Sequence, residues 1–237
     1  YAPLELPIVH VSVRSSEMIK YASNDFLALK ISYINEIANF CEIVGADIEE
    51  VARGMGMDRR IGSNFLKAGI GYGGSCFPKD TKALNFQSDH AGVKLKTVKA
   101  TIDVNREQRI KLIDKARRFF PDFRGVRVAI IGLTFKPGTD DLREAPAKQN
   151  IDILINEGAS VIAWDPLGVE NFRKRYPDCA INFAENIDEA LTDADVCLIM
   201  TEWEKIVEYP LDNYKKYMKR PLVFDGRNCY KLSEVEK

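Results

Sequence analysis

The chain has 237 residues, of which 46% are hydrophobic, and a formal net charge of −1 at pH 7. This length and apolar content allow one large hydrophobic core or two modest ones. Because acidic and basic residues are interspersed and nearly balanced, no overall field favours nucleic acid or an anionic membrane as a partner. No apolar run reaches the roughly 18 to 20 residues needed to span a bilayer, and no signal peptide opens the sequence.

Five cysteines and two histidines occur in the chain. The cysteines have no metal-type spacing, and the two histidines, His10 and His90, are far apart, so no metal site is expected. An odd number of scattered cysteines favours a reducing compartment over a disulfide framework. The expected location is therefore the cytoplasm.

The first predicted elements are a linker and a long helix. Residues 1–14 contain two prolines before an apolar run, and we expect an extended linker. A helical pattern without proline or glycine runs from Ser15, its expected cap, to Val44, and Gly45 ends it. At 1.5 Å per residue this helix is roughly 45 Å long. Its apolar positions cover more than one stripe, which predicts burial against a second subunit as well as its own domain.

Three shorter helices are predicted next. Asp47 and Glu50 form a capping-box pattern that begins a short helix ending near Gly54. Two more helices are expected, at 79–90 and 95–120, and Pro121 ends the second of them. Residues 15–120 are therefore interpreted as a helical central domain.

The texture changes after Pro121 to short apolar strands that alternate with helices. A helix is expected from Glu144 to Glu157, with Pro146 in its first turn. This alternation predicts an α/β fold with a parallel, doubly wound, Rossmann-like sheet over residues 121–237. The expected strands are 126–132, 160–164, 180–183, 195–201 and 221–224.

This second domain lacks the three-glycine spacing of a dinucleotide site. Gly132-Leu133-Thr134-Phe135-Lys136 follows its first strand, where Rossmann-like folds bind nucleotides. Asp165 follows the second strand, and the Asp165-Pro166 pair is interpreted as a turn rather than a ribose ligand. A dinucleotide is therefore not expected to bind to this domain.

A glycine-rich segment at residues 69–80 carries the strongest chemical signal. Its glycines let the backbone approach a ligand closely, and they precede Cys76. Because Pro78 suits a first helical position, we expect the cysteine to open a helix, where N–H groups and nearby Lys79 favour the thiolate. With Asp80 to move a proton, Cys76 is a candidate nucleophile. A buried structural cysteine on a glycine-rich turn is the competing interpretation.

Several blocks of sequence resemble the UDP-glucose/GDP-mannose dehydrogenase family. Their order and spacing resemble that family from about Ser15 to Arg227. The string around the cysteine is the most specific of them, because eight consecutive residues match. The blocks are Glu17–Asn24, Asn64–Lys67 with Gly73–Asp80, Gly132–Lys136, Asp141–Glu144 and Phe224–Arg227.

The resemblance assigns roles to individual residues. It implies that Cys76 is the nucleophile, that Lys20 and Asn24 stabilise the reacting oxygen, and that Asp80 acts with Lys20 on a water. Lys79 and Arg143 would face the nicotinamide cofactor. The second domain would hold the UDP part of the substrate, and Arg60 would extend into the neighbouring subunit's site. The implied substrate-binding residues are Arg60, Phe65, Leu66, Lys67, Tyr72, Gly73, Phe135, Lys136 and Arg227.

The implied reaction is an NAD-dependent, four-electron oxidation of UDP-glucose to UDP-glucuronate, through a thiohemiacetal and a thioester on the cysteine. The family also implies a homodimer through the long helix and an N-terminal domain with a Gly-x-Gly-x-x-Gly turn. Because no such turn occurs before the long helix, we expect this chain to be a piece that is inactive by itself. The string around Cys76 looks more like the UDP-glucose enzymes than their relatives.

Three alternatives stay open at this stage. GDP-mannose or another nucleotide sugar is the nearest, because base recognition does not follow from spacing. For this chain alone, a non-catalytic dimer that binds UDP-sugars is a second. A helical scaffold joined to an unrelated nucleotide-binding domain is the third, and the cysteine motif argues against it.

Overall fold

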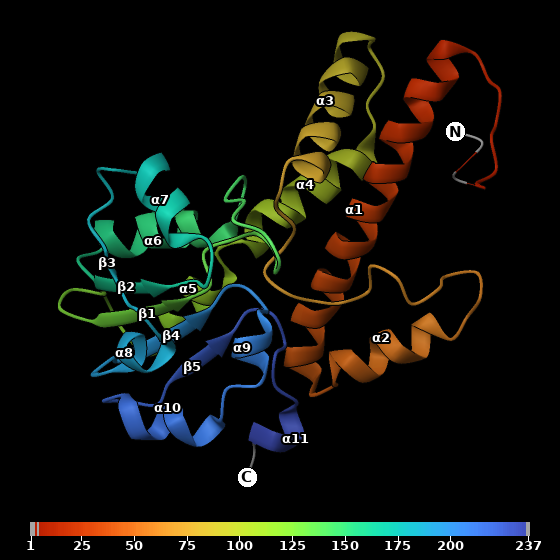
Figure 1. Cartoon of the computed structure of the whole chain (residues 1–237). Coiled ribbons are helices and arrows are strands. Elements are labelled where there is room, and N and C mark those ends of the chain that lie inside the picture. Colours follow the sequence, from red (N-terminus) through yellow and green to blue (C-terminus); the bar gives the residue numbers. More distant parts are fainter. Residues whose placement is uncertain (1–2, 4, 236–237) are drawn as a thin grey trace.

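The computed structural model describes residue 3 and residues 5–235, so part of the expected linker and the last two residues lie outside the described part. Two regions lie side by side (Figure 1): a helical region, residues 13–108, and a sheet region, residues 111–235, which holds the strands and the helices around them. The helices are α1 Val13–Val44, α2 Ile48–Gly56, α3 Cys76–His90, α4 Lys96–Gln108, α5 Lys111–Ala116, α6 Pro146–Asn156, α7 Val169–Arg175, α8 Ile187–Leu191, α9 Glu204–Val207, α10 Leu211–Tyr217 and α11 Leu232–Val235. The strands are β1 Arg127–Ile131, β2 Ser160–Trp164, β3 Asn182–Phe183, β4 Val196–Ile199 and β5 Val223–Asp225.

The long helix α1 is present, but its start differs from the prediction. It begins at Val13 rather than after Ser15, because Ser12 is extended and its side chain accepts a hydrogen bond from the Ser15 N–H. Gly45 ends the helix as predicted, with a left-handed φ of 74° that suits glycine. No helix among the described residues is both long and apolar enough to cross a membrane.

Helix α2 also departs from the prediction in two details. Asp47 caps it as expected, but its side chain accepts from the Glu49 N–H, and no return bond from Glu50 completes a capping box. The helix continues past Gly54 to Gly56. Glycine lowers helix propensity by only about 1 kcal/mol, which is too little to end a helix by itself.

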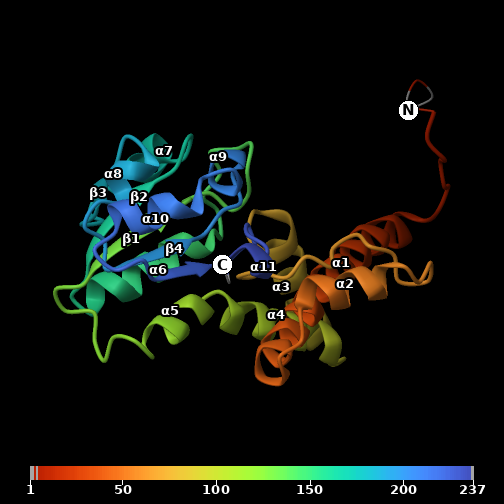
Figure 2. The same ribbon diagram turned by 90° about the horizontal axis from the view of Figure 1, so that it is seen from below.

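The predicted helix from Leu95 to Phe120 is two helices, α4 and α5. The break lies at Arg109 and Ile110, where the Arg109 carbonyl accepts a hydrogen bond from the Asn150 side chain in α6. That bond satisfies a carbonyl released from the helix, and the chain changes direction. Figure 2 shows the result: α4 lies beside α1, whereas α5 runs beneath the sheet.

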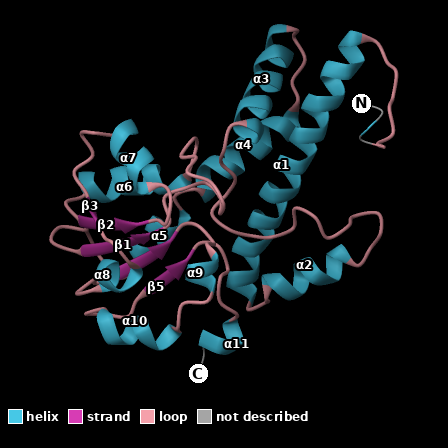
Figure 3. Ribbon diagram, in the orientation of Figure 1, coloured by secondary structure: helices cyan, strands magenta, loops and turns pink. Residues whose placement is uncertain are grey.

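The sheet confirms the predicted fold class. Five parallel strands lie in the order β3-β2-β1-β4-β5, with β1 paired to β2 and β4 (Figure 3). Because the strand order reverses between β1 and β4, the carboxyl ends of these strands border the crevice where α/β sheets bind ligands. The loop at Ile70 reaches this edge, since its N–H donates to the Gly226 carbonyl just after β5.

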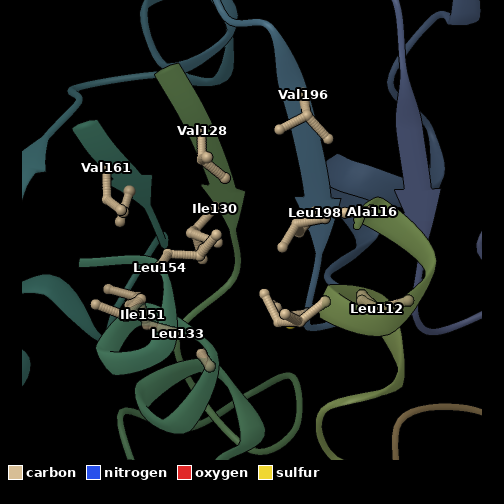
Figure 4. Packing of buried hydrophobic residues seen from close by; sticks show 14 of the residues in the cluster. Leu112, Ala116, Val128, Ile130, Leu133, Ile151, Leu154, Val161, Val196 and Leu198 are labelled. Atoms are coloured by element: carbon tan, nitrogen blue, oxygen red, sulfur yellow. The ribbon is translucent and has the colours of Figure 1, made fainter. Parts of the chain in front are cut away.

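The core of this region is apolar on both faces of the sheet. One cluster packs the sheet against α5 and α6, and Figure 4 shows how Leu112, Ile151 and Leu154 lie against strand residues such as Ile130 and Leu198. A second cluster packs the other face against α8 and α10. The sheet is therefore a rigid base whose carboxyl edge faces the helical region.

Candidate active site

Cys76 is the first residue of α3, and its side chain is exposed. Its Sγ lies 3.9 Å from the Oγ of Ser75, the residue before the helix. The expectation that the cysteine opens a helix is confirmed, although the helix begins at Cys76 rather than Lys79. Pro78 is therefore its third residue and not its first. A third position suits proline as well, because its missing N–H would have no partner within the helix.

Two residues of α1 converge on one carboxylate of α3. The Lys20 Nζ and the Asn24 Nδ2 both donate to the Asp80 Oδ2, each at 2.6 Å. Asp80 is fully buried, whereas more than half of the Lys20 side chain is exposed. Lys20 and Asn24 share a helix face because they are four residues apart. The sequence grouped these three residues, and the structure brings them together.

The electrostatics of this cluster favour a charged pair. Burial alone would raise the pKa of Asp80, but hydrogen bonds from Lys20 and Asn24 and the charges of Lys20 and Lys79 hold it below its usual value. The hydrogen bond to Asp80 raises the pKa of Lys20, and electrostatic interactions with Asp80 and Cys76 add to this effect. Asp80 Oδ1 has no hydrogen-bond partner among the described residues.

The two predicted cofactor residues, Lys79 and Arg143, are both exposed cations. The Lys79 Nζ is 3.5 Å from the Asp80 Oδ1, and most of its side chain is exposed. Arg143 forms a bidentate pair with Asp141, which raises the pKa of Arg143, and its electrostatic interaction with nearby Cys76 contributes further. Both cations are therefore near Cys76 and accessible.

A cavity of about 250 Å³ lies between the glycine-rich loop and the carboxyl edge of the sheet. Six of the predicted substrate residues line it: Phe65, Lys67, Tyr72, Gly73, Phe135 and Arg227. Ile31, Ala68, Gly71, Phe77 and Glu202 complete the lining. The cavity combines aromatic side chains with two cations and loop backbone, a composition suited to an anionic ligand that also has apolar faces.

Arg227 is the most constrained of these cations. Its Nε donates to the Met200 carbonyl at 2.9 Å, and its Nη1 donates to the Gly71 carbonyl at 3.1 Å. Its Nη2 is buried and has no partner among the described residues. Burial lowers the pKa of Arg227, and nearby Glu202 opposes that effect. An unsatisfied guanidinium N–H at a cavity wall is a donor available to an anionic ligand.

Three predicted substrate residues do not line the cavity. Leu66 is buried in a small cluster with Ile34, so its side chain has a packing role. Lys136 lies over the Phe135 ring, 5.4 Å from its centroid. Arg60 is exposed on the loop after α2, where it pairs with Asp58. Within one chain, Arg60 is not part of this site.

The spacing of the loop requires glycine at two positions. A Cβ at Gly73 would lie 2.4 Å from the Glu144 carbonyl oxygen, and Gly74 has φ 78° with the Phe135 ring 2.9 Å from its own Cβ position. A side chain would force the loop away from the sheet region at both places. These glycines therefore let the segment before Cys76 lie directly on the loop after β1.

Comparison with known proteins identifies the family. Residues 14–107 match the central domain of the UDP-glucose/GDP-mannose dehydrogenase family, and residues 129–232 match its UDP binding domain. The chain belongs to this family. It is 50% identical over 235 residues to the UDP-glucose 6-dehydrogenase YwqF of Bacillus subtilis, covering 99% of this chain and 53% of YwqF. The B. subtilis UDP-glucose 6-dehydrogenase TuaD is 43% identical, and 51% of it is covered.

A solved structure gives the same result. The UDP-glucose dehydrogenase of Pyrobaculum islandicum superposes with a TM-score of 0.91 and 33% identity, over 99% of this chain and 52% of that one. The chain thus spans about half the length of the relatives it matches. The similarity extends over both the helical and the sheet region.

The sequence analysis missed four amide side chains that support the glycine-rich loop of this site. Asn35 Oδ1 accepts from the Gly69 N–H, and Gln108 Nε2 donates to the Gly69 carbonyl. Asn105 accepts from the Tyr72 N–H and donates to its carbonyl, and Asn39 Nδ2 donates to Gln108 Oε1. The signal was present, because Asn105 and Gln108 are three residues apart on α4 and so share a face.

The sequence analysis also missed the carboxylate residue Asp25. It is 7% exposed, and neither of its carboxylate oxygens has a hydrogen-bond partner among the described residues. Burial raises its pKa to about 6, and the charge of nearby Asp80 adds to the shift. The site therefore contains one ionised and one readily protonated carboxyl group.

Asp165 has more than the predicted turn role. Its Oδ1 accepts from the N–H groups of Leu167 and Gly168, which is the expected turn. Its Oδ2 accepts from Leu133 N, Thr134 N, Thr134 Oγ1 and Trp203 Nε1. Because these bonds hold the loop after β1 against β2, the carboxylate has no free face for a ribose.

Proposed function

We propose that this chain is the substrate-binding and covalent-catalysis part of a nucleotide-sugar dehydrogenase that oxidises UDP-glucose to UDP-glucuronate. The observation that carries the proposal is the placement of Cys76 at a helix start beside the Lys20–Asn24–Asp80 cluster. A nucleophile with a cation, an amide and a carboxylate around it is suited to acyl chemistry. The names of the relatives supply the substrate.

The chemistry explains why a dehydrogenase needs a cysteine. Oxidation of the C6 alcohol removes a hydride and a proton and stops at an aldehyde. The Cys76 thiolate adds to the aldehyde carbon and forms a C–S bond, while the π pair of the C=O bond moves to the oxygen, which takes up a proton. The product is a thiohemiacetal, whose carbon again carries hydrogen and a hydroxyl oxygen. Loss of a second hydride and a proton leaves a thioester. Water then breaks the C–S bond and releases the carboxylate and the thiolate.

The residues around the cysteine have complementary roles in these steps. The Lys20 ammonium and the Asn24 amide stabilise the oxygen that becomes negative when the thiolate, and later water, adds to the carbon. Asp80 takes the proton of the attacking water through its Oδ1, which lies 3.5 Å from the Lys79 Nζ and has no hydrogen-bond partner among the described residues. Because Asp80 is ionised and buried beside Lys20, proton uptake and oxyanion stabilisation occur at adjacent atoms.

The nucleotide part of the substrate is assigned to the cavity at the sheet edge. Lys67 and Arg227 are suited to the diphosphate, and Phe65, Tyr72 and Phe135 offer aromatic surface. Leu66 would contribute its backbone and Lys136 its ammonium from the cavity rim. The sugar would then extend along Gly73 toward Cys76.

The proposed cofactor is NAD+; two NAD+ molecules, bound in turn, would each accept one of the two hydrides. Lys79 and Arg143 fit this role, because both are accessible cations near Cys76. The sheet region does not fit a dinucleotide, since Asp165 is fully occupied and a Cβ at Gly132 would already meet Thr201 at 2.6 Å. The remaining contacts to NAD+ would belong to parts of the enzyme other than this sheet.

The proposed assembly is a homodimer through α1. Large apolar side chains are exposed along this helix, where they would be covered by a second copy. They are Val13, Met18, Ile19, Phe26, Tyr33, Phe40, Ile43 and Val44. Arg60, which is free of its own chain's cavity, would then reach the site of the partner. The five free cysteines of the described residues suit a reducing compartment, and we place the enzyme in the cytoplasm.

Ligand-dependent unfolding tests the binding part of this proposal. The chain is heated with UDP-glucose, GDP-mannose or NAD+ separately, and the Arg227→Leu variant serves as the matched control. A ligand at about 100 times its Kd raises stability by roughly 2.7 kcal/mol. We expect a shift with UDP-glucose alone and its loss in the variant. A shift in unfolding temperature with GDP-mannose alone would mean that GDP-mannose, and not UDP-glucose, is the substrate. No shift with either sugar nucleotide would contradict the proposed binding site.

Turnover tests the catalytic part. In the complete enzyme, Cys76→Ala is expected to abolish UDP-glucuronate formation, because the aldehyde then has no route to a thioester. Product is measured by mass spectrometry together with NADH absorbance. Wild-type rates in this variant would refute the covalent mechanism. This chain alone is expected to bind UDP-glucose without producing NADH, and NADH formation by the chain alone would contradict that expectation.

A further inference from the structure

Glu144 stands in the loop between β1 and α6 with an unusual backbone conformation. Its φ is 52°, in the left-handed region that non-glycine residues rarely adopt. Strain of this kind persists only where surrounding contacts hold the backbone in place. The contacts of this residue are therefore informative about what the strain achieves.

The side chain of Glu144 joins two helices of the other region. Its Oε1 lies 3.0 Å from the Lys82 Nζ on α3, and its Oε2 lies 2.7 Å from the Arg109 Nη1 at the break between α4 and α5. Arg109 is mostly buried, so this pair is less screened than a surface ion pair. Burial alone would raise the pKa of Glu144, but the hydrogen bonds from Lys82 and Arg109 lower it, so the carboxylate stays ionised.

The backbone around Glu144 holds the segment before the cysteine. The Gly74 N–H donates to the Arg143 carbonyl at 2.8 Å. The Glu144 carbonyl oxygen lies so close to Gly73 that a Cβ there would be 2.4 Å away. The residue thus contacts α3 at Lys82 through its side chain and the loop that leads into α3 through its backbone.

We propose that Glu144 is a positioning residue for Cys76. Its carboxylate, fixed between Lys82 and Arg109, holds Glu144 in the strained conformation that docks Gly73 and Gly74 against the sheet region. The position of the cysteine at the start of α3 is thereby fixed relative to the cavity edge formed by Phe135 and Arg227. The catalytic meaning of this placement rests on the proposed function, but the coupling itself does not.

Hydrogen exchange on this chain tests the coupling without any substrate. Glu144→Gln keeps the shape of the side chain and removes its charge. Because the variant loses the charge that strengthens the hydrogen bonds from Lys82 and Arg109, protection of the Gly74 amide is expected to fall at least about tenfold. Amides of β1 and β4 are expected to keep their protection. Unchanged protection at Gly74, or an equal loss throughout the sheet, would overturn the proposal.

Two further variants make this result specific. Glu157→Gln is the matched control. Glu144 lies just before α6, whereas Glu157 lies just after it and pairs with Arg117, away from residues 69–76. It is expected to leave Gly74 unchanged. Glu144→Gly removes both the side chain and the strain. If backbone conformation alone holds the loop, the Gly74 amide will stay protected in Glu144→Gly. The proposal instead expects the Gly74 amide to lose about as much protection as in Glu144→Gln.

Kinetics of the complete enzyme give an independent result. Misplacement of a nucleophile by about 1 Å can cost up to a hundredfold in rate. Glu144→Gln is therefore expected to lower kcat at least about tenfold, by more than it raises KM for the sugar nucleotide, whereas Glu157→Gln leaves both constants unchanged. Wild-type kcat in Glu144→Gln would contradict the positioning role. Failure of the proposed function would appear differently, as wild-type enzyme that does not oxidise UDP-glucose.

Discussion

The interiors of the two regions are built from different residues. The sheet region buries apolar side chains almost throughout, such as Ile130, Leu154 and Leu198. Between α1, α3 and α4 many buried side chains are polar: Asp25, Ser32, Asn35, Asp80, Thr81, Thr101, Asn105 and Gln108. The large apolar residues of α1 are instead mostly on its outer face.

The difference follows from what each interior contacts. Strands satisfy their own backbone groups in the ladder, so an apolar layer can cover them. The glycine-rich loop has no ladder, and its N–H and C=O groups at Gly69 and Tyr72 need side-chain partners from α1 and α4. The polar interior is therefore the support of the candidate site, whereas the apolar interior supplies the stability of the base.

The largest expected effect lies in the sheet region. Leu154→Ala removes a fully buried side chain and is expected to lower the free energy of unfolding by about 2 to 5 kcal/mol. Urea unfolding followed by circular dichroism measures the change. Binding of UDP-glucose to the fraction that remains folded should be unchanged, because the side chain does not contact the cavity. A loss of affinity for UDP-glucose would show that packing in the sheet region also affects the binding site.

Asp25 gives the next largest effect, with the opposite sign. Its pKa is about 6 in the folded chain and about 4 when unfolded. As pH rises between these values the unfolded state releases its proton first, so the folded state loses stability and bears the full cost above pH 6. Asp25→Ala is therefore expected to stabilise the chain by up to roughly 3 kcal/mol at pH 8 and by much less at pH 4. Equal gains at both pH values would reject this explanation.

Asn105→Ala is expected to lower stability by about 2 kcal/mol, because both backbone groups of Tyr72 lose their partner. Unlike the change in the sheet, it should also expose the loop. Hydrogen exchange is expected to increase at residues 69–74 and to stay constant in β1. If exchange in the loop increases only as much as the loss of global stability requires, the side-chain amide of Asn105 does not hold the loop in the way proposed.

The smallest effect is expected at the surface of α4. Lys99 pairs with Asp103 at 2.7 Å, and more than half of the lysine side chain is exposed. Removing an exposed pair at this spacing costs at most about 0.5 kcal/mol. Lys99→Ala is thus the control for the other variants on α4, and a loss similar to that of Asn105→Ala would mean that α4 responds to any substitution.

Sequence reasoning worked best where the signal was local. The strands follow short apolar runs, and Gly45 ends α1 where a left-handed residue was expected. Its errors occurred where a distant contact decides. The helix expected over 95–120 breaks because Asn150 captures the Arg109 carbonyl, and nothing within residues 95–120 encodes that contact. A smaller error had a local cause: the start of α1 was misplaced because Ser12 and Ser15 can each cap a helix, and Ser12 does so.

The candidate site divides in the same way. By itself, the sequence determined the parallel α/β class and the shared helix face of Lys20 and Asn24, because strand patterns and helical spacing are local properties. Its resemblance to a family supplied the expectation that these two residues lie beside Cys76 and Asp80. Only the tertiary structure decided that Asn35, Asn105 and Gln108 hold the loop backbone and that Glu144 connects the loop to both regions. These groups lie far apart in the chain, and a polar residue reveals its partner only when burial forces it to have one.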